Sequence, residues 1–206
     1  SNSSAASDVY KRQEFISCAE KLQVGHPPGA PFYMLVGNLF TQFASDPSQV
    51  SRTVNFLNAL LSAGCILFLF WSITRLVRSL LKEEKENLSV TDVIIILGSG
   101  LVGALAYTFS DTFWFSAVEG EVYAFSSFLT ALVFWMILRW QDESDTVYGD
   151  RWIILIAYII GLSIGVHLLN LLCIPAIVLV FYYQKYRTIS LKGAIAAIAL
   201  SGLLIV

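Results

Sequence analysis

The sequence predicts an all-α protein, a polytopic transmembrane helical bundle with membrane-lying helices in its first external loop. Hydrophobic residues make up 56% of the 206 residues, whereas charged residues make up only 14%. A soluble domain carries roughly 25% charged residues. The charges also gather in short patches between long uncharged runs, which is typical of membrane-spanning helices. The net charge of −2 gives no indication of a nucleic-acid partner.

The two ends of the sequence lead us to expect an internal fragment of a longer membrane protein. Residues 1–13 are interpreted as a non-native leader, because 1–7 are low in complexity and 8–13 resemble a translated sequencing adapter. Residues 14–51 are expected to form an external loop with two interfacial helices. Residues 52–206 are expected to form a transmembrane bundle of about six crossings, the last of them truncated.

The predicted external loop places two short helices on either side of a break. Residues 14–24 carry apolar side chains at helical spacing, and Gly25 is expected to end this helix. The motif HPPGAP (26–31) interrupts the chain, and its last proline suits the first position of a second helix that runs to about Ala44. The second helix is too short to cross a bilayer, so we expect it to lie in the interface. A turn and helix cap are expected at 45–48.

Long uncharged runs predict the crossings. They hold 22, 18, 17 and 33 residues, at 53–74, 93–110, 122–138 and 152–184. Because a crossing helix needs about 20 apolar residues, each of the first three runs predicts one crossing. The fourth run is too long for one crossing, and we expect two short helices that meet near 166–175. A further crossing begins at Gly193.

Basic residues predict the orientation in the membrane. Segments 75–91, 139–151 and 185–192 hold nine lysines and arginines, whereas the opposite side holds Lys21 and Arg52 in addition to those of the leader. Since cytoplasmic loops are rich in lysine and arginine, the three segments are predicted to be cytoplasmic. The loop 14–51 is then external.

The predicted external face carries carboxylates and two histidines. Such groups can accept a proton from an attacking hydroxyl or hold a metal ion beside a phosphate. The candidates are Glu14, Glu20, His26, Asp111, Glu119, Glu121, His167 and Asn170. Solvated loop carboxylates are the alternative interpretation. Three cysteines show no metal-ligand spacing, so no metal site is assigned.

The two histidines and the two adjacent glutamates differ in what they predict. His26 sits in a rigid Pro/Gly frame that suits a preorganised site, although it can equally be a turn residue. His167 lies within the 33-residue uncharged run, where an imidazole is functional by default or bonds a carbonyl at a helix break. On a helix Glu119 and Glu121 would diverge by about 200°, so we do not expect them to form one carboxylate pair.

Three stretches carry a resemblance to a known family. EFISCAEKLQVGHPPGAPFYMLVGNLF, EGEVYAFSSFLTALVFWMILRW and GLSIGVHLLNLLCIPAIVLVFYY resemble the bacterial membrane family related to protein O-mannosyltransferases, within the GT-C glycosyltransferase superfold. The resemblance implies an inverting enzyme of the bacterial plasma membrane with an external active face. It implies a polyprenyl-phosphate-linked, mannose-like sugar as donor and a hydroxyl acceptor on protein Ser/Thr or a glycan. No cofactor is implied with certainty, and the need for a divalent metal is left open.

The resemblance also implies roles for individual residues. The family's external loop opens with an Asp-Cys-Gly-Glu-Phe-like block, whose end matches Glu14-Phe15 and whose aspartate would fall at Lys11. The chain as written would therefore lack that catalytic aspartate and the first span, and is expected to be inactive. Glu14 is the catalytic candidate. Residues expected to bind substrate, including the leaving phosphate, are His26, Arg52, Asp111, Glu119, Glu121 and His167.

Two other classes of protein remain open at this point. A transporter or flippase would show inverted repeats and broken helices near mid-membrane, and only the interrupted run around His167 fits. A non-catalytic membrane scaffold is the third possibility. The clustering of external acidic groups favours the enzyme. Arg52 can also be a snorkelling residue at the end of a span.

Overall fold

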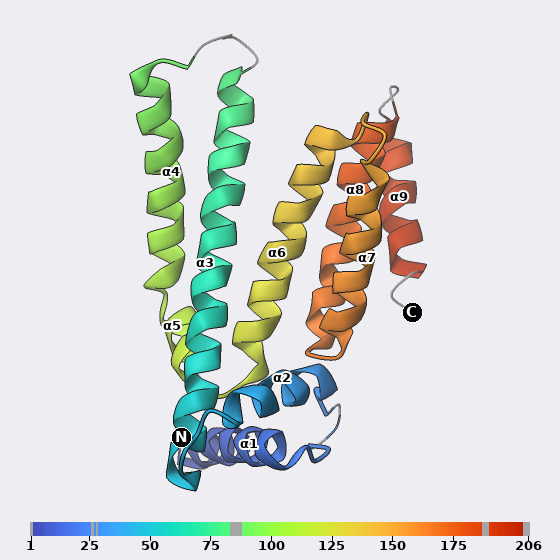
Figure 1. The fold of residues 1–206 in the computed structure, drawn as a ribbon. Coiled ribbons are helices and arrows are strands. Elements are labelled where there is room, and N and C mark those ends of the chain that lie inside the picture. The colour runs from blue at the N-terminus through green and yellow to red at the C-terminus, as the bar shows by residue number, and fades with distance from the viewer. Residues whose placement is uncertain (1, 26, 28, 83–87, 187–189, 204–206) are drawn as a thin grey trace.

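The predicted fold class is confirmed by a computed structural model that describes residues 2–25, 27, 29–82, 88–186 and 190–203 (Figure 1). Every regular element in these ranges is a helix. The α-helices are α1 (Asn2–Lys21), α2 (Pro31–Thr41), α3 (Val50–Lys82), α4 (Val90–Thr108), α5 (Asp111–Val118), α6 (Val122–Glu143), α7 (Asp150–Ile164), α8 (Cys173–Lys185) and α9 (Leu191–Leu203). Two short 3₁₀ helices, η1 (Pro47–Gln49) and η2 (Leu168–Leu172), complete the described elements. His26 lies outside the described residues.

The long helices stand side by side as a bundle. α3 packs against both α4 and α6, α6 packs against α7 and α8, and α8 packs against α9. Among the described helices, α3, α4 and α6 are long and apolar enough to cross a membrane. The expected number of about six crossings stays a prediction. The described parts of the three basic segments all lie at one end of the bundle, which is the upper end in Figure 1.

Helices α1 and α2 lie across the opposite end of the bundle, at a steep angle to α3 (Figure 1). This is the arrangement expected of helices that lie in a membrane interface. α2 begins at Pro31, as predicted, and ends at Thr41. The turn after it is also confirmed, because the Asp46 carboxylate accepts a 2.8 Å hydrogen bond from Ser48 N and caps η1. That hydrogen bond lowers the pKa of Asp46.

Helix α1 ends earlier than the sequence predicts. The expected end was Gly25, but the last helical residue is Lys21. Leu22 adopts a left-handed conformation (φ 48°), and Gln23 N donates to Cys18 O at 2.9 Å. This hydrogen bond closes the end of the helix. The left-handed position after a helix is usually occupied by glycine, and here it is occupied by Leu22. Asn38 Nδ2 on α2 then donates to Ala19 O at 2.9 Å, which ties the end of α1 to α2.

Two other segments refine the predictions. The 33-residue run is broken as expected, because α7 ends at Ile164 and α8 begins at Cys173. The segment 111–121, which lies between two of the predicted crossings, contains the eight-residue helix α5. This helix leaves only Glu119–Glu121 as a short link to α6.

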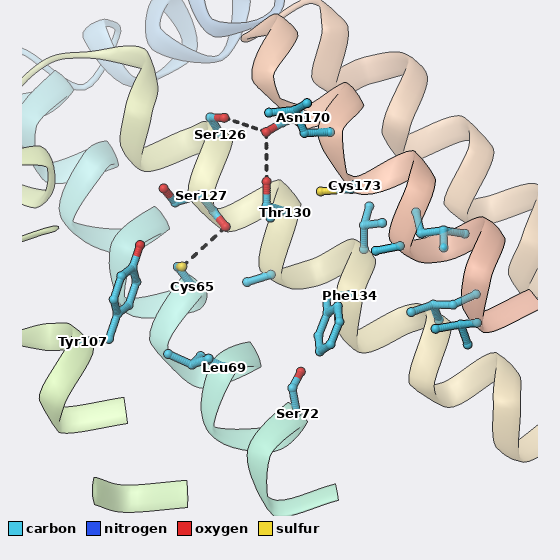
Figure 2. Close-up of a pocket in the computed structure, with 17 residues that line it drawn as sticks. Cys65, Leu69, Ser72, Tyr107, Ser126, Ser127, Thr130, Phe134, Asn170 and Cys173 are labelled. Carbon is cyan, nitrogen blue, oxygen red and sulfur yellow. Dashed lines mark hydrogen bonds between the residues drawn. The ribbon is translucent and has the colours of Figure 1, made fainter. Parts of the chain in front are cut away.

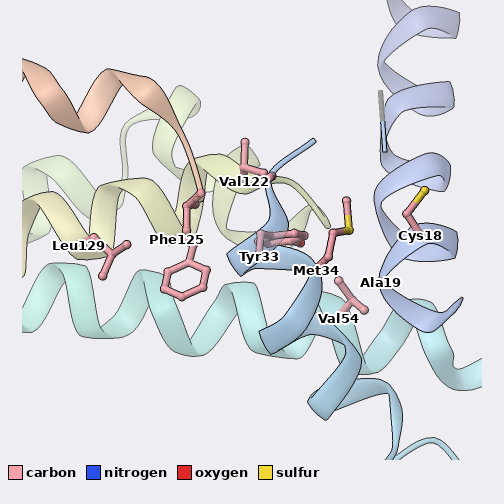
Figure 3. Close-up of a cluster of buried hydrophobic side chains, with 10 residues drawn as sticks. Cys18, Ala19, Tyr33, Met34, Val54, Val122, Phe125 and Leu129 are labelled. Atoms are coloured by element: carbon pink, nitrogen blue, oxygen red, sulfur yellow. The ribbon is translucent and has the colours of Figure 1, made fainter. Parts of the chain in front are cut away.

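A buried apolar cluster joins α1 and α2 to the bundle (Figure 3). Ala19, Tyr33 and Val54, from three different helices, are each fully buried in it. The ring of Phe15 meets Tyr33 edge-on with the centroids 5.8 Å apart, and Phe125 adds a contact from α6. The cluster therefore holds α1 and α2 against the ends of α3 and α6.

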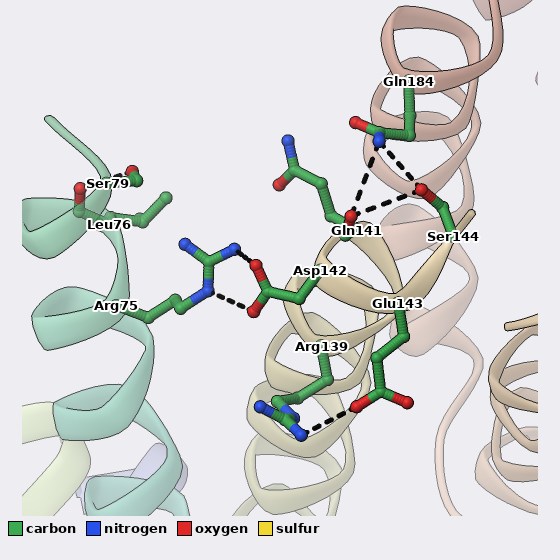
Figure 4. A network of polar contacts seen from close by, with 9 residues as sticks. All are labelled: Arg75, Leu76, Ser79, Arg139, Gln141, Asp142, Glu143, Ser144 and Gln184. Carbon is green, nitrogen blue, oxygen red and sulfur yellow. Dashed lines mark hydrogen bonds and ion pairs between the residues drawn. The ribbon is translucent and has the colours of Figure 1, made fainter. Parts of the chain in front are cut away.

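Polar contacts close the other end of the bundle (Figure 4). The Arg75 guanidinium on α3 binds the Asp142 carboxylate on α6 through two hydrogen bonds, of which Nε–Oδ2 is 2.6 Å. Gln184 Nε2 on α8 donates to Ser144 Oγ at 2.9 Å. These contacts connect α3, α6 and α8 at the end that carries the basic segments.

Candidate active site

Four separate segments meet at the end of the bundle where α1 and α2 lie, and they line a cavity of about 220 Å³. We call it the Glu14 cavity. It brings together Glu14 of α1, Gly29 and Ala30 before α2, Glu121 at the start of α6 and His167 after α7. Three of the residues predicted to serve the site therefore share one cavity. Each of the three is half-buried.

The chain before α2 and the chain after α7 are held together by backbone. Phe32 N donates to Gly165 O at 2.8 Å, which satisfies one of the free N–H groups at the start of α2. A Cβ at Gly165 would lie only 3.0 Å from Phe32 Cβ, so the close approach needs a glycine. Ala30, in a left-handed conformation (φ 40°), turns the chain into α2 at this point. The contact places residues 29–31 beside the helix break that carries His167.

The link Glu119–Glu121 is held in place by Asn58, which lies in the first third of α3 and faces the link. The Asn58 side chain is fully buried, and its Nδ2 donates to Glu119 O and to Glu121 O, the latter at 2.9 Å. Its Oδ1 accepts a hydrogen bond from the Tyr33 hydroxyl at 3.4 Å. Burial raises the pKa of Tyr33, so the phenol stays protonated and keeps its proton to donate.

Glu119 and Glu121 are not on a helix, contrary to the geometry assumed from the sequence. Both have extended backbone angles (φ −111° and −129°). Glu121 N donates to Glu119 O at 2.8 Å, so the chain makes a tight turn at Gly120 between them. Both residues line a second cavity of about 510 Å³, the Glu119 cavity, together with Tyr107, Tyr123 and Ser127. Glu121 and Tyr123 also line the Glu14 cavity, so the two cavities are neighbours.

His167 is held at the break between α7 and η2. Its backbone N–H donates to Ser163 O at 2.9 Å. Its ring lies 5.5 Å from the ring of Tyr123, at an angle of 45°. The imidazole therefore faces the start of α6, next to Glu121, and not the middle of the bundle.

The remaining predicted site residues lie elsewhere. Arg52 lines a separate cavity of about 820 Å³, the Arg52 cavity, with Phe43, Phe56 and Val118. Asp111 is exposed at the first position of α5, and Glu20 is exposed on α1. The structure thus does not bring Arg52 or Asp111 into the Glu14 cavity. In the part of the chain that the structure describes, no three metal-ligating side chains gather into a possible metal site.

Sequence reasoning missed the residues that hold the site together. Asn58 is an amide inside a 22-residue uncharged run, and a polar side chain in such a run commonly bonds another element. That signal was available for Asn58. Tyr33 carries no comparable signal, because aromatic residues are common throughout the chain.

The arrangement can perform proton transfer beside a bound polar group. The carboxylate of Glu14 on α1, the carboxylate of Glu121 before α6 and one imidazole border a small cavity that is also lined by Phe15 and Val122. Carboxylates and imidazole are the usual general bases and acids of enzymes. The adjoining Glu119 cavity, with its hydroxyl groups from Ser110, Thr112 and Tyr123, offers hydrogen-bonding partners for a polyhydroxylated ligand.

Comparison with known proteins gives one family and two curated relatives. A family model described as the N-terminal domain of protein O-mannosyl-transferase TMEM260 matches residues 13–190. The chain is 26% identical over 196 residues to protein O-mannosyl-transferase TMEM260 of Mus musculus, covering 93% of this chain and 25% of that protein. It is 22% identical over 177 residues to protein O-mannosyl-transferase tmem260 of Dictyostelium discoideum, covering 82% of this chain and 19% of that protein. No solved structure matches significantly.

These matches refine the resemblance seen in the sequence. The O-mannosyltransferase part of the expectation agrees with both relatives, whereas both relatives come from eukaryotes and not from bacteria. The chain spans a quarter or less of the length of either relative.

Proposed function

Because the chain belongs to the family of the protein O-mannosyl-transferase TMEM260 N-terminal domain, we propose that it forms part of a membrane glycosyltransferase. The proposed enzyme moves a mannose-like sugar from a polyprenyl-phosphate donor to a hydroxyl group, most simply that of a protein serine or threonine. The proposal takes the printed names of the relatives as its guide to the acceptor and the sugar. The lipid-linked donor and the inverting GT-C chemistry come from the sequence resemblance.

In the proposed reaction the acceptor oxygen attacks the anomeric carbon of the sugar. The bond between that carbon and the phosphate oxygen breaks, and its electron pair leaves with the polyprenyl phosphate. The proton of the hydroxyl passes to a carboxylate, which acts as general base. We assign Glu14 to this role. We assign Glu121 to binding the sugar and His167 to stabilising the leaving phosphate.

One observation supports the proposal most strongly: Glu14, Glu121 and His167 line one cavity although they are far apart in sequence. A structural purpose would not require titratable groups from α1, α6 and the α7–η2 break at one place. The position of the cavity at an end of the bundle suits a lipid-linked donor, whose sugar lies at the membrane surface while its chain lies in the hydrocarbon.

We propose that the protein spans the plasma membrane several times, with the Glu14 cavity on the external face. In bacteria this membrane is the inner membrane. The orientation rests on the positive-inside rule. It is supported by the separation of the described basic segments from the Glu14 cavity, since they lie at opposite ends of the bundle (Figure 1).

A transfer assay with the whole protein that contains this chain tests the proposal. The substrates are a polyprenyl-phosphate mannose and a peptide with serine and threonine. Glu14→Gln should lower transfer about 100- to 10,000-fold, the usual contribution of a general base. The matched control is Glu20→Gln, because Glu20 lies on the same helix but is exposed and does not line the cavity.

Full transfer by Glu14→Gln would contradict the assignment of Glu14. A wild-type protein that moves the lipid-linked sugar across vesicles without transferring it would contradict the enzyme and support a flippase.

A further inference from the structure

A third cavity, of about 480 Å³, lies within the bundle between α3, α6 and α8 (Figure 2). We call it the Asn170 cavity. Its lining runs along α6 from Ser126 to Ile137, a distance of about 16 Å at the rise of an α-helix. Phe134 and Leu172, both exposed, form part of its rim. The cavity is therefore an elongated groove that opens on the side of the bundle.

The groove is polar at one end and mainly apolar along its length. At the polar end the Asn170 Oδ1 accepts hydrogen bonds from Ser126 Oγ at 2.6 Å and from Thr130 Oγ1 at 2.9 Å (Figure 2). Apolar side chains line the rest, with Ser72 as an exception: Leu69, Ala131, Val133, Phe134, Ile137, Ala176, Ile177 and Val180. An elongated apolar groove with one polar end fits an amphipathic chain.

Asn170 supplies a hydrogen-bond donor that nothing within the described residues uses. The side chain is 4% exposed, and its Nδ2 has no hydrogen-bond partner there. Leaving a buried donor without an acceptor costs about 1–3 kcal/mol. Both hydroxyl groups donate to Oδ1, so Nδ2 is the end of the amide that is left without a partner among the described residues. The position of Nδ2 therefore points to a ligand with an acceptor oxygen.

The surroundings indicate a neutral acceptor. Among the residues that the structure describes, no lysine or arginine lines the Asn170 cavity. Tyr107 and Ser127, at its polar end, also line the cavity of Glu119 and Glu121. An anionic phosphate would lack a cation here and would lie near two carboxylates. The ester carbonyl of an acyl chain is uncharged and accepts a hydrogen bond.

The depth of Asn170 agrees with an ester group. Its partner Ser126 lies four residues, about 6 Å, from the start of α6. The polar region of a bilayer extends roughly 5–8 Å beyond the hydrocarbon core on each side. An ester at the inner edge of that region would lie at the level of Asn170, with its acyl chain along α6 and α8.

We propose that the Asn170 cavity binds one acyl chain of a glycerophospholipid, whose ester carbonyl accepts a hydrogen bond from Asn170 Nδ2. The bound lipid fills the groove between α3, α6 and α8. This proposal does not rest on the transfer reaction.

Native mass spectrometry of the whole, purified protein tests it. Delipidated protein is offered a diester phosphatidylcholine or the diether analogue, which has the same chains but no ester carbonyl. The wild type should retain the diester roughly 2- to 10-fold better than the diether, the range of one neutral hydrogen bond. Asn170→Leu should abolish this preference while still binding both lipids.

A second pair of variants keeps the test valid if Asn170→Leu fails to fold. Ala176→Trp, which fills the cavity wall on α8, should lower retention of the diester. Ala157→Trp is its control, because Ala157 is exposed on α7 and does not line the cavity. Equal retention of diester and diether by the wild type would overturn the hydrogen bond to the carbonyl. Preferential displacement of the phospholipid by polyprenyl phosphate would overturn the acyl-chain assignment.

Discussion

At the scale of single residues, the site depends on a buried amide. Asn58 joins α3 to the Glu119–Glu121 link and to Tyr33 through hydrogen bonds from both ends of its side chain. Replacing it leaves the Glu121 carbonyl and the Tyr33 hydroxyl without the partner they have in Asn58, whereas Glu119 O keeps its hydrogen bond from Glu121 N. The cost of such groups is the reason why buried polar networks are sensitive to change.

Asn58→Leu is expected to lower the free energy of unfolding by about 2–4 kcal/mol, because at least two buried polar groups lose their partner. Denaturant unfolding in detergent measures this change. Asn55→Leu is the matched control on the same helix, since Asn55 Oδ1 has no hydrogen-bond partner among the residues described. An equal loss of stability in both variants would contradict the attribution of the loss to the Asn58 hydrogen bonds.

At the scale of elements, the site depends on how closely α2 approaches the end of α7. The hydrogen bond from Phe32 N to Gly165 O is a backbone contact, so no side chain can replace it. It sets the position of residues 29–31 relative to His167, which lies two residues after Gly165. The geometry of the Glu14 cavity therefore depends on a glycine that carries no chemistry itself.

Gly165→Ala is expected to destabilise the protein by about 1–3 kcal/mol, the usual cost of overpacking, because the added Cβ would press on Phe32. Thermal unfolding and sugar transfer should both fall. Gly161→Ala is the control on α7, where a Cβ would have no atom within 4 Å. There the better helix propensity of alanine should raise stability by about 0.5–1 kcal/mol. Stabilisation by both substitutions would refute the close-packing argument.

Local features were predictable from the sequence, whereas contacts between distant segments were not. The start of α2 at Pro31, the cap at Asp46 and the break after Ile164 follow from proline, aspartate and glycine placed beside apolar runs. The conformation of the Glu119–Glu121 link was not predictable, because Asn58, about 60 residues away in sequence, holds it by its carbonyl groups. The early end of α1 was not predictable either, because leucine rarely adopts the left-handed conformation that Leu22 has here.

At the scale of the whole molecule, the bundle separates two chemically different ends. The Arg75–Asp142 pair and the described basic segments lie at one end, and the Glu14 cavity lies at the other (Figures 1 and 4). The positive-inside rule predicts that the basic end faces the cytoplasm. The proposed sugar transfer then takes place outside.

The orientation can be measured with single cysteines in a variant that lacks Cys18, Cys65 and Cys173. Ser45→Cys and Asp145→Cys place exposed thiols at the two ends of the bundle. In intact cells a membrane-impermeant maleimide should label Ser45→Cys and not Asp145→Cys, and both should react after permeabilisation. The reverse pattern in intact cells would place the Glu14 cavity in the cytoplasm.

The most direct measurement of the central claim is the position of a bound donor. The whole protein would be imaged with a polyprenyl phosphonate sugar that cannot be cleaved. We predict that the sugar lies in the Glu14 cavity, within hydrogen-bond distance of Glu14 or Glu121, with the phosphonate near His167. A sugar bound in the Arg52 cavity, away from these three residues, would contradict the proposed active site.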